Sequence, residues 1–209
     1  VLSQSFHQNW KLKDAGLSLS YLSDSSTIQL VSDRVFIDQS ISDRLEQRSF
    51  SHQKILTYFV NSFRFNENET PYSFVSAASE NMMGKTLMNN EIVINSWLAN
   101  DLQILVGDSL QVDYYAMDPL RKLVEKTAWF KVSEIVPVET ETLNRSLMPA
   151  FPGLSEAGNC RDWDAGIPID LRKIRDKDEQ YWTDYRGAPK AYISLDQGLR
   201  LWGNPFGNF

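Results

Sequence analysis

The sequence contains only one cysteine and two histidines in 209 residues. A lone cysteine cannot form a disulfide within the chain, so cysteine usage does not report on the redox compartment. The histidines, His7 and His52, are far apart, and no His or Cys pair has the spacing of zinc ligands. Neither histidine is near Cys160 in the sequence to act as its general base, so we expect a buried or semi-buried, inert thiol. We predict no metal ion and no other cofactor.

Basic clusters are also scarce. The chain has a net charge of −6 and a pI of about 5.0. Its one basic run, Arg172–Arg175, is surrounded by Asp170, Asp176 and Asp178. Nucleic acids and anionic lipid surfaces are bound through a basic face. We therefore expect no nucleic-acid partner.

Long hydrophobic runs are missing as well, since no segment approaches the roughly 18 apolar residues of a membrane span. Hydrophobic residues make up 42% and charged residues 23% of the chain, a composition typical of a globular protein. The sequence begins at Val1 and ends at Phe209, and neither end resembles a natural terminus. We therefore expect the chain to be part of a longer protein, in which there is room for membrane segments outside these residues.

The motifs of common catalytic sites are absent or incomplete. There is no G-x-S-x-G motif for a nucleophilic serine. Met83–Thr86 ends like a phosphate-binding loop, but Ser79 stands where the upstream glycine is needed. A calcium loop beginning at Asp162 would need Asp or Asn and then Gly where Gly166 and Ile167 stand. We predict no catalytic residue and no ATP binding.

The hydrophobic periodicity predicts an α+β fold with a mixed sheet and short helices. We expect strands at residues 17–22, 28–37, 55–65, 72–77, 91–94, 110–115, 129–138 and 191–195. Helices are expected at residues 1–13, 40–48, 95–102, 170–187 and 196–202, and loops at 66–71 and 79–90. Two parts are predicted: a first α+β lobe, residues 1–88, and a second, residues 89–209, with a long irregular and helical excursion at about 139–187.

A few polar and aromatic residues stand out from these elements. Asp178 falls on the apolar stripe of its helix, between Ile174 and Tyr181, so we expect it to be buried and to bond a donor. Most aromatic residues occupy inward-facing periodic positions, which favours core packing. Trp163 lies among polar residues instead. With Asp162 and Asp164 it forms the candidate for a surface contact.

Several segments carry a resemblance to a known family. Residues 90–102 read NEIVINSWLANDL, Val106-Gly107-Asp108 follows, and residues 129–136 read WFKVSEIV. This order resembles the extracytoplasmic core of FtsX/MacB-like permeases. Residues 189–203 are similar to the next strand and helix of that core. Residues 12–38 and 160–182 resemble a subgroup of large permeases with a long excursion. Glu134 departs from the family, which has glycine at its position.

The resemblance implies a non-catalytic extracytoplasmic domain of an ABC transporter permease. Such a domain lies on the periplasmic side of the inner membrane and couples ATP-driven motion to export or to the handling of lipoproteins or other substrates. The implied partners are a separate cytoplasmic ATPase subunit and either a second permease copy or a periplasmic protein. A secreted glycan- or peptide-binding module or hydrolase, built on Trp163, Asp162 and Asp164, is the alternative.

Overall fold

A computed structural model describes residues 11–22, 26–33, 36–48, 51–118, 120, 122–138, 151, 153–164 and 166–203. The strands are β1 (Leu17–Leu22), β2 (Thr27–Ser32), β3 (Ile55–Phe65), β4 (Asn68–Ala78), β5 (Glu91–Asn95), β6 (Ser109–Met117), β7 (Leu123–Val136) and β8 (Ala191–Ser194). The helices are α2 (Gln39–Glu46), α3 (Glu80–Met83), α4 (Ser96–Leu102), α5 (Asp176–Tyr185) and α6 (Leu195–Trp202). Short 3₁₀ turns occupy Leu12–Ala15, Cys160–Asp162 and Leu171–Lys173. The predicted α+β class is confirmed.

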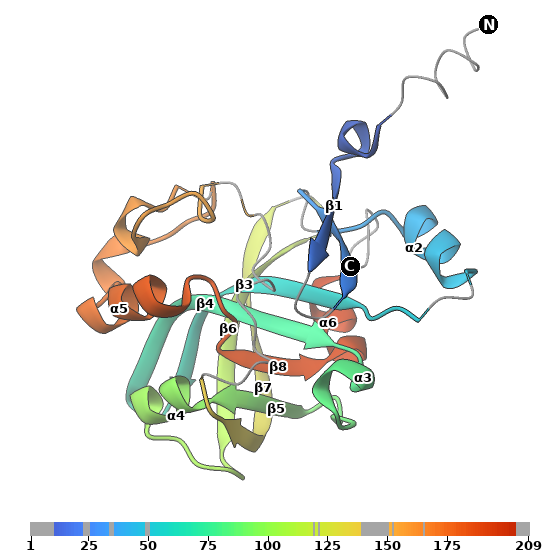
Figure 1. Ribbon diagram of the computed structural model, residues 1–209. Helices are drawn as coiled ribbons and strands as arrows, with labels where there is room; N and C mark the ends of the chain where they lie inside the picture. Colours follow the sequence, from blue (N-terminus) through green and yellow to red (C-terminus); the bar gives the residue numbers. More distant parts are fainter. Residues whose placement is uncertain are drawn as a thin grey trace, which may run out of the picture.

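Six strands close into a barrel in the order β3-β4-β8-β5-β7-β6 (Figure 1). Two neighbouring pairs, β4–β8 and β5–β7, are parallel, and the other pairs are antiparallel. The sheet is therefore mixed, as predicted, but closed, which the sequence analysis did not predict. Closure leaves the barrel without unpaired edge strands.

A large hydrophobic cluster fills the barrel. Its members come from all six strands and from the two helices that pack on them, because Leu98 and Leu102 of α4 and Trp202 of α6 belong to the same cluster. Helix α6 packs closely on β4: a Cβ built on Gly198 would lie 2.2 Å from the Cβ of Ala77. Only glycine permits this approach of helix to strand.

The segment that carries the family resemblance has the expected elements. β5 leads into α4, and β6 and β7 then pair antiparallel with each other, while β7 also pairs in parallel with β5. The side chain of Asn95 caps α4 by accepting a hydrogen bond from the Leu98 N–H at 2.8 Å. The predicted boundary at residues 88 and 89 falls between β4 and β5 of one barrel.

Several predicted boundaries are wrong. Residues 66–71 are not a loop, because β3 and β4 form a hairpin with only Asn66 and Glu67 in the turn, and Pro71 pairs with Ser62 inside it. The helix expected from Asp170 begins at Asp176, after a separate 3₁₀ turn. β7 begins earlier than expected, at Leu123. The predicted strand at 28–37 ends at Ser32, and the helix expected within residues 1–13 falls largely outside the described residues.

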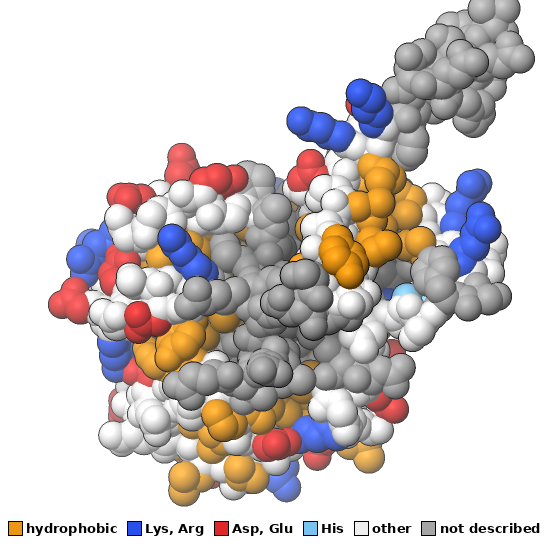
Figure 2. Space-filling model, viewed as in Figure 1, with side chains coloured by type: hydrophobic (Ala, Val, Ile, Leu, Met, Phe, Trp, Pro, Cys, Tyr) orange, Lys and Arg blue, Asp and Glu red, His pale blue; other side chains and the backbone are white. Residues whose placement is uncertain are grey.

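The N-terminal hairpin of β1 and β2 stands apart from the barrel (Figure 1). Leu19 pairs with Leu30, and Tyr21 pairs with Ile28. Leu19, Tyr21 and Ile28 are more than half exposed, and an apolar patch is visible over this hairpin in Figure 2. The excursion, which ends in α5, lies at the left of the barrel in the same view (Figure 1).

Candidate functional site

The excursion packs on the barrel through an aromatic cluster. Phe59 of β3 and Phe74 of β4 meet Trp163 and Trp182 from the excursion. The Trp163 ring lies edge-on to Phe59, with centroids 5.9 Å apart, and edge-on to Trp182, at 5.1 Å. Such pairs add to the hydrophobic stabilisation of this junction.

The expected surface position of Trp163 is therefore wrong. Its side chain is only 8% exposed, because the excursion folds back and buries the ring against β3. The neighbouring Asp162 and Asp164 are exposed. Asp162 accepts a hydrogen bond from the Asn159 side chain at 2.6 Å, the local loop bonding expected of such a residue. The three candidate residues do not form a shared surface.

A charged cluster beside the aromatic residues joins α4 to the start of α5. The side chain of Asp101 in α4 is 3% exposed and forms ion pairs with Arg175, at 2.6 Å, and with Lys177. Thr70 of β4 also donates to it, at 2.5 Å. Although burial opposes ionisation, hydrogen bonds from Lys177, Thr70 and Arg175 hold the pKa of Asp101 below its usual value. The carboxylate is therefore ionised at neutral pH.

Asp178 shares Arg175 with Asp101. Its carboxylate accepts hydrogen bonds from the Arg175 backbone N–H at 2.9 Å and from the guanidinium at 2.7 Å. Asp178 is the third residue of α5, where a carboxylate favours the positive end of the helix and closes a capping box. The prediction that Asp178 is buried and hydrogen-bonded is confirmed, since the residue is 6% exposed.

Lys190, immediately before β8, is the least expected buried residue. It is 3% exposed, and its ammonium lies 4.0 Å from the ring centroid of Trp97 and 4.5 Å from that of Tyr181. Burial lowers the pKa of Lys190 to about 8, and the carboxylates of Asp178 and Asp101 partly counter this effect. The two ring faces stabilise the charged form by cation–π attraction.

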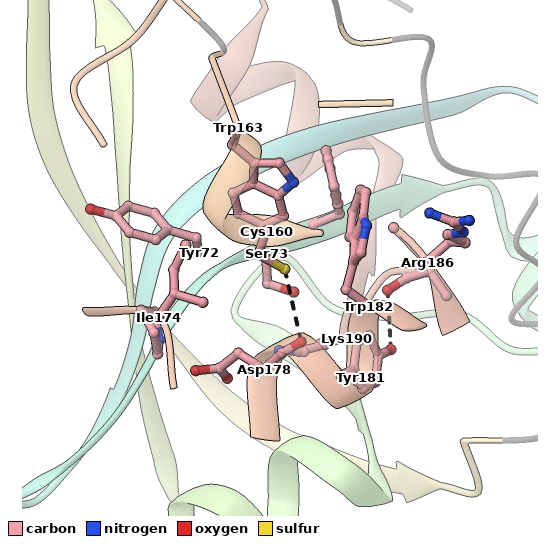
Figure 3. Close-up of a pocket in the computed structure, with 14 residues that line it drawn as sticks. Tyr72, Ser73, Cys160, Trp163, Ile174, Asp178, Tyr181, Trp182, Arg186 and Lys190 are labelled. Carbon is pink, nitrogen blue, oxygen red and sulfur yellow. Dashed lines mark hydrogen bonds between the residues drawn. The ribbon is translucent and has the colours of Figure 1, made fainter. Parts of the chain in front are cut away.

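A small cavity lies between these groups, lined by Cys160, Asp178, Tyr181 and Lys190 among others (Figure 3). Its volume is about 20 Å³, enough for one water molecule and far below the size of a substrate. Cys160 donates to the Asp178 carbonyl oxygen at 3.9 Å. Burial, with the nearby carboxylate of Glu179, raises the pKa of the Cys160 thiol to about 12. The expected buried thiol is confirmed, and as a neutral thiol it is a poor nucleophile.

A second, larger hollow of about 380 Å³ is open to solvent. Its walls come from β3, β4, β6 and β7 on the barrel side and from residues 168–173 on the excursion side. Most of its lining is polar or charged: Asn61, Ser62, Arg64, Tyr72, Tyr115, Glu125, Pro168, Ile169, Asp170 and Lys173. We name this hollow the polar groove. Its size suits a small ligand or a side chain of a partner.

Sequence patterns missed the main residues of this junction. Lys190 follows Pro189 and precedes an apolar strand, which gave a weak signal of burial. Arg175 stood out only as part of a basic run. Asn61 sits in the middle of a strand rich in apolar residues, an unusual place for an amide.

No group of three or more His, Cys, Asp or Glu side chains suited to a metal ion occurs among the described residues. Within the same part of the chain, no helix has both the length and the hydrophobicity of a membrane span. The chain matches no protein-family model and no curated protein.

Proposed function

We propose that this chain is a non-catalytic extracytoplasmic domain of an ABC transporter permease of the FtsX/MacB-like type. One observation carries the proposal: the residues of the family-like segment have defined roles in the order strand, helix, turn and strand pair. Asn95 caps α4. Gly107 has a φ of +100°, and Asp108 closes the turn by accepting from the Leu105 N–H at 2.9 Å. These residues lie within the segment that resembles the family, and the resemblance rests on the order of its elements.

The junction between barrel and excursion fits a mechanical role. Aromatic packing and the ion pairs of Asp101 join the excursion to the barrel wall, so the two parts can move together when membrane segments pull on the domain. Force applied at one end of such a packed body is transmitted because close-packed interiors deform little. In the proposed function the domain carries cargo or a partner through this motion, while a cytoplasmic ATPase subunit supplies the energy.

The alternative of a secreted glycan- or peptide-binding module or hydrolase rested on an exposed Trp163. Since that ring is buried, the alternative loses its aromatic contact residue and keeps only the exposed Asp162 and Asp164.

This proposal is tested on the complete protein, purified from its native membrane. The full reading frame should encode several membrane spans outside these residues. The detergent-solubilised protein should copurify with an ATPase subunit whose turnover the permease changes. A full-length protein with a signal peptide, no spans and no associated ATPase would refute the proposal and favour a secreted module.

A further inference from the structure

The polar groove lies where the barrel wall departs from regular pairing. In β3 the side chains that pack on the barrel core are those of residues 56, 58 and 60, and then 63 and 65. The alternation thus shifts at Asn61 and Ser62. Tyr72, which stands opposite Asn61, has a φ of +35°. The regular β3–β4 pairing includes neither Asn61 nor Tyr72. Irregularities of this kind redirect side chains and are common beside functional sites.

The cations at the groove are already paired. Arg64 contacts Glu69 at 3.3 Å and Asp113 at 3.4 Å. Lys173 contacts Glu69 at 3.2 Å. The Asp170 carboxylate forms an ion pair with Arg172, at 2.8 Å. An anionic ligand would have to compete with these carboxylates for each cation.

The acceptors at the groove, in contrast, are not saturated. Among the described residues Glu125 has no ion pair, and its carboxylate is held by the Asn61 side-chain N–H at 2.6 Å. The other end of the same amide, Asn61 Oδ1, is buried and accepts no hydrogen bond from any described residue. A buried acceptor without a donor is unfavourable, and here it coincides with the break in the β3–β4 pairing.

Aromatic rings stand beside these acceptors. Tyr115 lies directly opposite Glu125 in the β6–β7 pairing, and Tyr72 lines the same hollow. Burial, with the carboxylate of Glu125, raises the pKa of Tyr115, consistent with a carboxylate close to the phenol. Around the groove and in direct contact with its lining, carboxylates outnumber cations by one: Glu69, Asp113, Glu125 and Asp170 against Arg64, Arg172 and Lys173.

We infer that the polar groove binds a primary ammonium or guanidinium group, carried either by a small amine or by a lysine or arginine side chain of a polypeptide. Glu125 is the counter-ion, the Asn61 side-chain N–H holds its carboxylate in place, and the Tyr115 ring contacts the cation. This inference is independent of the transporter proposal, because it concerns a site within the 209-residue chain alone.

The test is a titration of the 209-residue chain followed by ¹H–¹⁵N NMR at low ionic strength. The probes are N-acetyl-lysine methylamide, n-butylammonium and, as the uncharged control, N-acetyl-norleucine methylamide. Both cations should cause saturable shifts at Asn61, Tyr115 and Glu125, and the norleucine compound should not. A backbone contribution would make the lysine compound bind about tenfold more tightly than butylammonium, which identifies a polypeptide ligand; equal binding identifies a small amine.

Two variants make the test specific. Glu125→Gln should weaken binding of the lysine compound about tenfold, since it removes a charged hydrogen-bond acceptor. Glu134→Gln, at the other end of the same strand and paired with Lys85, should leave binding unchanged. The inference is overturned if the norleucine compound binds equally well, if Glu125→Gln binds like the unmodified chain, or if neither cation gives saturable shifts.

Discussion

The guanidinium of Arg175 lies 2.6 Å from the carboxylate of Asp101, although the two residues are 74 positions apart in the sequence. The same guanidinium contacts Asp178, so one cation neutralises two carboxylates that are each less than a tenth exposed. Removing one member of such a cluster leaves the others buried without compensation. Arg175 is therefore the residue on which attachment of the excursion to the barrel depends most.

Replacement of Arg175 by methionine should lower the free energy of unfolding by about 2–3 kcal/mol. This is less than for a fully buried pair, because the Arg175 side chain is 32% exposed. Arg172→Met is the control: that side chain is 89% exposed, and its loss should change stability by less than about 0.5 kcal/mol. Urea unfolding curves that superimpose for the two variants would show that the cluster does not hold the excursion.

Gly107 provides a test of the turn between α4 and β6. Its φ of +100° is unfavourable for any residue with a Cβ, yet a Cβ built there would have no neighbour within 4 Å. Gly107→Ala should therefore cost about 1 kcal/mol through backbone strain alone. Gly158→Ala is the matched control, since its surroundings are also open and its φ is not in the left-handed region. Thermal unfolding should show a lower midpoint for the first variant only.

Lys190 should make stability depend on pH above neutrality. Its folded-state pKa of about 8 lies below the ordinary value of 10.5. Below pH 8, Lys190 is protonated in both the native and the unfolded chain. The native state then bears the full free-energy cost of burying the charged ammonium. Between pH 8 and 10.5 the unfolded chain retains the proton that the native state has lost, so the free energy of unfolding rises with pH.

Lys190→Met isolates this contribution, because methionine is an unbranched side chain of nearly the same length without the charge. Relative to this variant, the unmodified protein should gain up to about 2 kcal/mol between pH 7 and 9.5. Denaturant unfolding at the two pH values gives the difference directly. A constant difference between the two proteins would mean that Lys190 keeps its proton throughout this range.

Local patterns were sufficient for elements whose side chains repeat at a regular interval. Leu98 and Leu102, four residues apart, predicted α4, and alternation predicted β1. Non-local pairing was not predictable in this way. The barrel closes through β3 and β6, where Ser62 stands opposite Asp113, and nothing in either strand alone identifies the other as its partner.

The errors have physical causes too. Pro71 suggested a loop because proline lacks an N–H, but a strand tolerates it where that N–H is not needed for pairing. Trp163 suggested a surface contact because its sequence neighbours are polar. Its environment is set instead by Phe59, more than a hundred residues earlier in the sequence.

The most direct test of the proposed function is the side of the membrane on which this domain lies. Asp164→Cys places a thiol at an exposed position, whereas the native Cys160 is buried and serves as an unreactive internal control. Cells that produce the complete protein with this substitution should be labelled by a membrane-impermeant maleimide while intact, and the labelled protein should sediment with the membranes. Labelling only after lysis, or recovery of the protein in the soluble fraction, would contradict an extracytoplasmic permease domain.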